Sequence, residues 1–334
     1  MKRAVLILSS FIFAALLFAI GISDKQPEQK IILKYAEVNP AGHIMDQCGY
    51  HFAELVRVKS NGRITVQVFP DSRLGNEKTM YQTLQKGGGT IDICRANTNS
   101  MGEFGCNKLG LLGLPFVFRD RAHLWTVLDS EIGDELLRDP QECGSGMVGL
   151  YYLDEGCRNL FTRKEIEVRT LKDFKGLKLR VPETALMADT VAALGAKPAP
   201  ILFSELYSSL KNGVVDGAEQ PFSGYYSNKL YEVAPNYTLT GHVFSPSIVL
   251  ISEKVWNKLS SEDRKILLFA GKETEDWNRI TIEMLDNELI KDIKNAGANI
   301  IEIKDKSEFV NAAKSVDKKY AAGYEKLYEA ILAK

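Results

Sequence analysis

The chain has 334 residues and a nearly balanced charge, with 42 Lys and Arg against 43 Asp and Glu and a formal net charge of −1. This balance argues against a nucleic-acid-binding protein, which needs a basic face to neutralise phosphates. The 15 Phe, 13 Tyr and 3 Trp exclude a disordered acidic chain, and the length predicts about two domains of ordinary size. If the protein recognises an anion, a few placed side chains must do so.

The N-terminus has the pattern of an export signal. Met1–Arg3 is a short basic start, and the 19 residues of Ala4–Ile22 carry no charge. These are the two leading regions of a secretory signal peptide, so we expect residues 1–23 to be removed and the protein to act outside the cytoplasm. Nineteen such residues are also long enough to span a bilayer, and an uncleaved anchor is the alternative.

Hydrophobic periodicity and turn residues predict alternating strands and helices. The expected strands are 31–38, 63–69, 91–94 and 177–181, and the expected helices are 44–58, 80–86, 182–195 and 260–297. This alternation is typical of an α/β protein with largely parallel sheets. The last helix has about 34 residues and a length on the order of 50 Å, so we expect it to lie against two lobes. Its predicted apolar stripe is Ile266, Phe269, Ala270, Trp277, Ile280, Met284 and Ile293.

The sequence contains none of the common enzyme or metal-binding motifs. There is no H-E-x-x-H, G-x-S-x-G, Walker A or G-x-G-x-x-G pattern. The five cysteines (Cys48, Cys94, Cys106, Cys143 and Cys157) fit no zinc spacing. Cys94 with Cys106 and Cys143 with Cys157 are the pairs close in sequence, although buried thiols are the favoured reading. We therefore expect no catalysis, no metal and no cofactor.

Arg180 is the most informative single residue. In Leu177–Val181 the alternate apolar side chains share one face of a strand, so Arg180 points the other way. It stands at the carboxyl end of that strand, where open α/β sheets bind their ligands. A guanidinium offers a planar fork that matches a carboxylate. The ordinary alternative is an ion pair with a neighbouring acidic residue.

The surrounding sequence resembles the solute-binding proteins of TRAP transporters, the DctP family. The resemblance is strongest over Leu171–Pro221, which includes Leu179–Pro182, Phe203–Glu205 and Gly213–Pro221, and it extends over nearly everything after the signal. It implies a two-lobed, periplasmic-binding-protein-like α/β fold with mixed sheets flanked by helices, hinge strands and a long spanning helix. Lobe I is expected at 30–155 with 246–285, and lobe II at 156–245 with 286–334.

The resemblance also implies which residues contact the ligand. The family's carboxylate anchor matches Arg180, a second arginine matches Arg158, and an aromatic side chain that packs on the ligand matches Phe203. The family usually has Asn where this chain has Gln220, a departure that retains the amide but moves it by one methylene. The remaining predicted ligand-binding residues are Glu37, Asn39, His43, Arg95, Asn97 and Glu183, each of which has an ordinary structural alternative such as a cap or a surface ion pair.

The family resemblance implies capture of a small organic acid by lobe closure and its delivery to a sodium-driven membrane permease. The number of hydroxyl-compatible side chains favours a hexuronate such as glucuronate or galacturonate. A four-carbon dicarboxylate or another hydroxy acid is the alternative ligand, and a ligand-sensing receptor subunit or an exported hydrolase is the alternative function. We expect a monomer that binds no nucleic acid.

Overall fold

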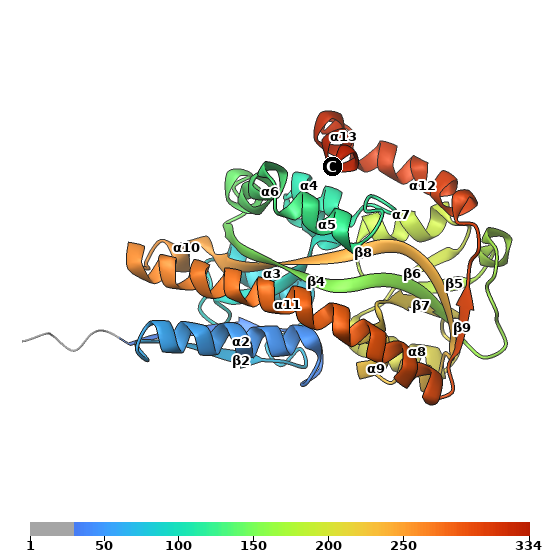
Figure 1. Ribbon diagram of the computed structural model, residues 1–334, viewed down its shortest axis with the longest axis horizontal. Coiled ribbons are helices and arrows are strands. Elements are labelled where there is room, and N and C mark those ends of the chain that lie inside the picture. Colours follow the sequence, from blue (N-terminus) through green and yellow to red (C-terminus); the bar gives the residue numbers. More distant parts are fainter. Residues whose placement is uncertain (1–29) are drawn as a thin grey trace, which may run out of the picture. The chain divides into compact units, whose positions relative to one another are not determined.

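A single mixed β-sheet forms the centre of the computed structural model, which describes residues 30–334 (Figure 1). The strand order is β2-β1-β3-β8-β4-β7-β5-β6, and β9 pairs with β8. The strands are β1 (Ile31–Ala36), β2 (Ile64–Phe69), β3 (Ile93–Asn97), β4 (Met147–Thr162), β5 (Lys178–Val181), β6 (Lys197–Pro200), β7 (Gly217–Gln220), β8 (Asn236–Ser252) and β9 (Asn299–Glu302).

Helices cover this sheet and connect its strands. The α-helices are α2 (Ile44–Lys59), α3 (Glu77–Gln85), α4 (Asn107–Gly110), α5 (Arg121–Leu128), α6 (Glu131–Glu142), α7 (Ala185–Ala193), α8 (Leu206–Lys211), α9 (Phe222–Ser227), α10 (Glu253–Trp256), α11 (Ser261–Asn295), α12 (Ser307–Tyr320) and α13 (Glu325–Ala333). The 3₁₀ turns are η1 (Thr98–Phe104), η2 (Leu111–Gly113), η3 (Leu171–Phe174), η4 (Phe203–Glu205) and η5 (Leu230–Glu232). The predicted α/β fold class is confirmed.

Two long antiparallel strands join the two ends of the sheet. β4 has 16 residues and β8 has 17, and they pair from Met147 with Ser252 to Thr162 with Asn236. β3 pairs with β8 near one end of this ribbon, and β7 pairs with β4 near the other. The register shifts between Asp154 and Cys157, where Gly156 adopts φ 103°. The long ribbon therefore carries a local irregularity between its two halves, a common device for bending strands.

The expectation of largely parallel sheets is wrong at the centre. β3 with β8, β4 with β8 and β4 with β7 are antiparallel, whereas β1 with β3 and β5 with β6 and β7 are parallel. The periodicity of a buried strand does not encode the direction of its neighbour. β3 also extends to Asn97, so Arg95 and Asn97 lie in a strand and not in the loop expected after residue 94.

The long helix is present, but its predicted buried face is partly wrong. α11 has 35 residues and runs along the β4–β8 ribbon (Figure 1). Phe269, Ile280 and Met284 are exposed, with exposed fractions of 43%, 67% and 62%. Its buried face uses small and polar residues where the helix approaches β4. A Cβ on Gly271 would lie 2.5 Å from the Tyr151 ring, and Asn278 Oδ1 accepts a hydrogen bond from the Asp154 amide at 2.7 Å.

Two further expectations concern the termini of elements and the cysteines. α7 begins at Ala185 with Thr184 as its N-cap, not at Pro182, because the Thr184 hydroxyl accepts a hydrogen bond from the Met187 amide. All five cysteines are free, and the close thiols are Cys106 and Cys143, whose Sγ atoms are 3.7 Å apart.

The predicted signal, residues 1–23, lies outside the described residues. Within residues 30–334, no helix has the length and apolar character needed to cross a bilayer.

The thiol geometry predicts which pair a mild oxidant joins. We expect oxidation of the folded protein to link Cys106 to Cys143, because this pair needs little more than side-chain rotation to reach bonding distance. Peptide mapping by mass spectrometry under non-reducing conditions measures this. Cys143→Ser should abolish the crosslink and Cys94→Ser should not. A bond between Cys94 and Cys106, or between Cys143 and Cys157, contradicts the prediction.

Candidate functional site

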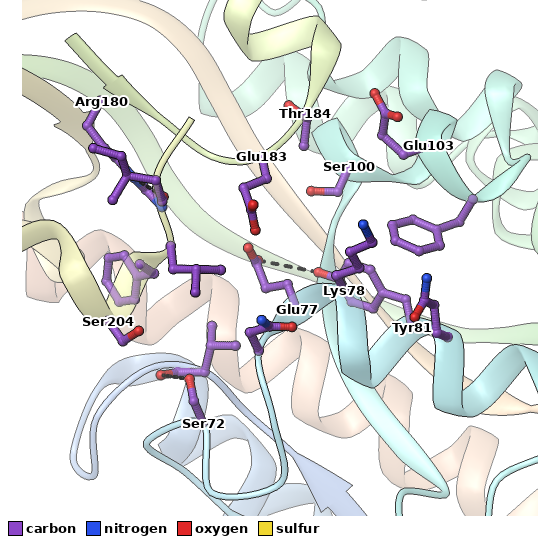
Figure 2. A pocket seen from close by; sticks show the side chains of 17 residues that line it. Ser72, Glu77, Lys78, Tyr81, Ser100, Glu103, Arg180, Glu183, Thr184 and Ser204 are labelled. Atoms are coloured by element: carbon purple, nitrogen blue, oxygen red, sulfur yellow. Dashed lines mark hydrogen bonds between the residues drawn. The ribbon is translucent and has the colours of Figure 1, made fainter. Parts of the chain in front are cut away.

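The sheet and its connections surround a cleft with two adjoining cavities. The larger has a volume of about 270 Å³, and the smaller one about 30 Å³. We call the smaller one the deeper cavity, because most of the residues that line it are buried. The two cavities share Val38, Glu77, Arg180 and Phe203 in their linings and therefore adjoin. Glu77 comes from α3 and Arg180 from β5 (Figure 2). Val38 follows β1, and Phe203 is the first residue of η4. The cleft thus lies between segments far apart in the sequence.

Arg180 is a buried guanidinium with spare hydrogen-bonding capacity. Its exposed fraction is 2%, and its Nε donates to the Ile201 carbonyl at 2.8 Å. Nη1 has no hydrogen-bond partner among residues 30–334. Burial lowers the pKa of Arg180 to about 10, and neighbouring Glu219 only partly opposes this. A buried charge without a bound counter-ion is costly, and an incoming carboxylate satisfies it.

Phe203 supports the orientation of this guanidinium. The Arg180 Cζ lies 5.8 Å from the centroid of the Phe203 ring, which is within the range of a cation–π contact. Phe203 lines both cavities and is only partly buried, so its ring also presents an apolar surface to the cleft. Phe203, predicted to pack on the ligand, therefore lies beside the predicted anchor Arg180 in the wall of the cleft.

Arg158 has a different environment, because it already has a carboxylate partner. It forms an ion pair with Glu219, with one hydrogen bond at 2.7 Å from Nη2 to Oε1 and a second from Nε to Oε2. Both side chains are buried. Burial acts to raise the pKa of Glu219, but Arg158 and His242 lower it to about 2. Arg158 lines the deeper cavity, so it offers a ligand a charge that is largely compensated.

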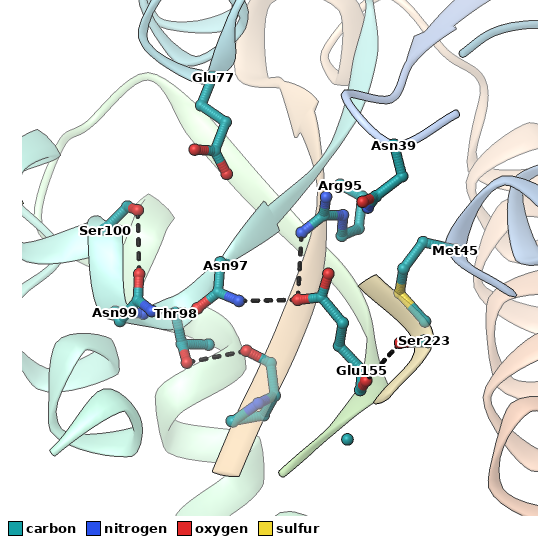
Figure 3. Close-up of polar contacts among 12 residues, drawn as sticks. Asn39, Met45, Glu77, Arg95, Asn97, Thr98, Asn99, Ser100, Glu155 and Ser223 are labelled. Atoms are coloured by element: carbon teal, nitrogen blue, oxygen red, sulfur yellow. Dashed lines mark hydrogen bonds and ion pairs between the residues drawn. The ribbon is translucent and has the colours of Figure 1, made fainter. Parts of the chain in front are cut away.

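A second buried network surrounds Arg95 (Figure 3). Arg95 donates to both carboxylate oxygens of Glu37, at 2.9 and 2.7 Å, and its Nη1 lies 3.6 Å from Glu155 Oε2. Asn39 donates to Glu37 through its backbone and side-chain nitrogens at 2.8 Å, and Asn97 Nδ2 donates to Glu155 at 2.9 Å. This network fixes Asn39, Arg95 and Asn97 in the wall of the deeper cavity. Glu37 lies behind the wall.

His43 and Gln220 complete the set of predicted residues near the deep end. His43 lines neither of these cavities. It is the N-cap of α2, where Nδ1 accepts a hydrogen bond from the Met45 amide at 3.1 Å. Gln220 is the last residue of β7 and lines the deeper cavity beside Arg158 and Arg180. Gln220 therefore shares the wall of the deeper cavity with Arg180, whereas His43 and Glu37 lie outside its lining.

The larger cavity contains residues that sequence reasoning missed. The most prominent is Glu77, the first residue of α3, which is half-buried and accepts a hydrogen bond from the Tyr81 hydroxyl at 3.3 Å. Polar side chains around it include Ser72, Asn76, Gln82, Ser100 and Ser204. Placing the helix start at Met80 left Glu77 in an unassigned loop. The signal for the observed start of α3 was Asn76, an N-cap residue whose side chain accepts a hydrogen bond from the Thr79 amide.

Glu183 and Glu103 are the remaining carboxylates of the larger cavity. Glu183 follows β5, as predicted, and its carboxylate points into the cavity (Figure 2). Glu103 Oε1 accepts a hydrogen bond from the Ala185 amide at 2.9 Å, so it connects η1 with the start of α7 across the cleft. Within residues 30–334, no group of three or more His, Cys, Asp or Glu side chains is arranged to hold a metal ion.

A known protein family matches most of this chain. Residues 35–323 match the family model of bacterial extracellular solute-binding proteins, family 7, named DctP. The chain belongs to this family. The 2,3-diketo-L-gulonate-binding periplasmic protein YiaO of Escherichia coli is 31% identical over 78% of this chain and 78% of that protein.

Solved structures of this family have the same fold. A TRAP periplasmic solute-binding protein of a Bradyrhizobium species, in complex with galacturonate, is 34% identical and has a TM-score of 0.85, covering 90% of this chain and 99% of that chain. One from Pseudomonas putida F1, with bound D-glucuronate, is 31% identical with a TM-score of 0.85, covering 90% and 96%. The two-lobed fold is thereby confirmed, and this DctP protein is a TRAP solute-binding protein, not an enzyme.

The buried position of His43 predicts a distinctive pH dependence of stability. Burial lowers the pKa of His43 to about 4, so the unfolded chain takes up its proton at a higher pH than the native protein does. The unfolded state then binds more protons, and this contribution to stability falls as pH decreases from about 6.5 to about 4. Denaturant unfolding at several pH values measures it.

His43→Asn is the matched variant, because Asn also caps helices. We expect the wild-type free energy of unfolding to fall relative to that of His43→Asn over this pH window. An identical pH dependence in both proteins, or an NMR titration of His43 near pH 6.5, contradicts the buried neutral ring.

Proposed function

We propose that this DctP protein binds a hexuronate such as galacturonate or glucuronate and delivers it to the permease subunits of a TRAP transporter. The observation that carries the proposal is Arg180, whose buried guanidinium faces the cleft with an Nη1 that no group of residues 30–334 pairs with. A ligand carboxylate provides the counter-ion and acceptors that this group lacks. Gln220 and Arg158 lie beside it and complete the carboxylate subsite.

The rest of the cleft suits a small molecule with several hydroxyl groups. The larger cavity, of about 270 Å³, is close to the lower end of the roughly 300–1,000 Å³ typical of ligand pockets. Its polar walls contain Ser, Asn, Gln and carboxylate side chains, and Asn39, Arg95 and Asn97 add donors at the deep end. The structural relatives crystallised with galacturonate and glucuronate support the same ligand class.

The proposed mechanism is closure of two lobes about the long ribbon. The expected boundaries, 30–155 with 246–285 and 156–245 with 286–334, cross β4 and β8 beside the register shift next to Gly156. Hinges are commonly a few residues that absorb a change in backbone dihedrals. On closure, Arg180 and Phe203 of one lobe would meet Val38 and Glu77 of the other around the ligand, and water would leave the cleft.

Export and partnership follow from the same proposal. The family is extracellular, and the basic and apolar N-terminus fits export by a signal that is removed. We expect a monomer that meets its permease in the membrane. The alternative ligand is a four-carbon dicarboxylate or another hydroxy acid. The alternative partner is a membrane sensor protein, to which this protein would report the bound ligand.

Removing the Arg180 guanidinium should abolish useful binding. We expect Arg180→Ala to weaken galacturonate binding by about 100-fold or more, because two charge-assisted hydrogen bonds of about 1.5–3 kcal/mol each are lost. Arg180→Lys should bind with intermediate affinity, since the charge remains but the planar fork does not. Isothermal titration calorimetry with galacturonate and glucuronate measures both variants.

Arg57→Ala is the matched control, because Arg57 lies exposed on α2 and pairs with neighbouring Glu54 there. It should bind like the wild type. Near-native affinity in Arg180→Ala would show that Arg180 does not anchor the ligand carboxylate. A wild-type protein that ignores both uronates but binds a four-carbon dicarboxylate or a neutral sugar removes the proposed ligand class.

A further inference from the structure

The charged groups of the larger cavity are distributed unevenly. Arg180 lies at one end, and three carboxylates, Glu77, Glu103 and Glu183, line the rest together with Lys78. Glu103 is engaged by the Ala185 amide. Lys78 lies on the exposed side of α3, where water screens its charge. The groups that a bound ligand meets opposite Arg180 are therefore mainly Glu77 and Glu183.

Glu77 and Glu183 point toward one another across the cavity (Figure 2). They come from opposite walls, Glu77 from the start of α3 and Glu183 from the segment after β5. Glu77 is half-buried and lines both cavities, and burial raises its pKa although Arg95 and Arg180 oppose the shift. Glu183 is exposed. Two facing carboxylates accept hydrogen bonds from ligand hydroxyls and repel another anion.

We propose that Glu77, facing Glu183, is a specificity-determining residue that restricts the ligand to acids with one carboxylate and hydroxyls at the other end. This inference rests on the proposed function, because it assumes that the first carboxylate lies on Arg180. After closure, a second carboxylate at the far end of a ligand would lie beside two like charges in a cleft from which water is excluded. Discrimination of this kind comes from repulsion of the wrong ligand as well as attraction of the right one.

Galacturonate and galactarate are six-carbon acids with the same hydroxyl configuration, the first a pyranose ring and the second an open chain. Galacturonate has one carboxylate and a hydroxyl-bearing carbon at its other end, whereas galactarate, its C1-oxidised relative, has a carboxylate at both ends. The same anchor on Arg180 is available to both. They differ in the ring as well as in the charge at C1, so the effect of Glu77 is read from the change in their affinity ratio when Glu77→Gln removes the protein charge.

The test measures the affinity of the full mature chain for galacturonate, glucuronate and galactarate by calorimetry. We expect the wild type to prefer galacturonate over galactarate by about 100-fold or more, since like charges brought together cost several kcal/mol. Glu77→Gln should reduce this preference by about 10-fold or more, because Gln keeps the size and hydrogen bonding of Glu and removes the charge. Glu183→Gln should have a smaller effect because Glu183 is exposed.

Glu54→Gln, an exposed substitution on α2, is the control and should leave the preference unchanged. Thermal unfolding of each variant shows that it folds, and a structural role for Glu77 would weaken both ligands equally without changing their ratio. Equal binding of galactarate and galacturonate by the wild type, or an unchanged ratio in Glu77→Gln, overturns the inference alone. Failure of both uronates to bind overturns the proposed function and the inference with it.

Discussion

The site depends on one electrostatic imbalance, the buried guanidinium of Arg180, whose Nη1 has no hydrogen-bond partner among residues 30–334. The other two arginines of the deep cleft are matched within the chain, Arg95 by Glu37 and Arg158 by Glu219. Those pairs hold the walls in place, as buried and hydrogen-bonded ion pairs do. Arg180 instead donates to a backbone carbonyl and keeps Nη1 unpaired. In the proposed function an anionic ligand completes the set, so that ligand binding is coupled to lobe closure.

The fold places this guanidinium by means of a long shared framework. The β4–β8 ribbon pairs with β3 near one end and with β7 near the other, and α11 follows it along its length. Arg95 and Asn97 belong to β3, while Arg158 and Gln220 belong to β4 and β7. Residues of the two walls are thus joined through continuous strands, whose irregularity beside Gly156 is a natural point for bending.

Arg180 could be predicted from sequence because strand periodicity and its place at a strand end are local signals. Its freedom from an internal counter-ion could not, because pairing is settled by tertiary contacts such as that of Arg158 with Glu219, which are 61 residues apart. Glu77 was missed because the start of α3 was placed three residues late. The antiparallel centre of the sheet and the exposed Ile280 and Met284 of α11 also reflect packing partners that periodicity does not specify.

The most direct test of the account is the structure of the protein in complex with galacturonate. We expect the sugar carboxylate on the guanidinium of Arg180, with the Arg158–Glu219 and Arg95–Glu37 pairs retained and the ligand hydroxyls toward Glu77. A carboxylate bound elsewhere in the cleft, with Arg180 turned to a protein carboxylate, contradicts the central claim. So does a ligand that breaks the Arg158–Glu219 pair to bind Arg158 alone.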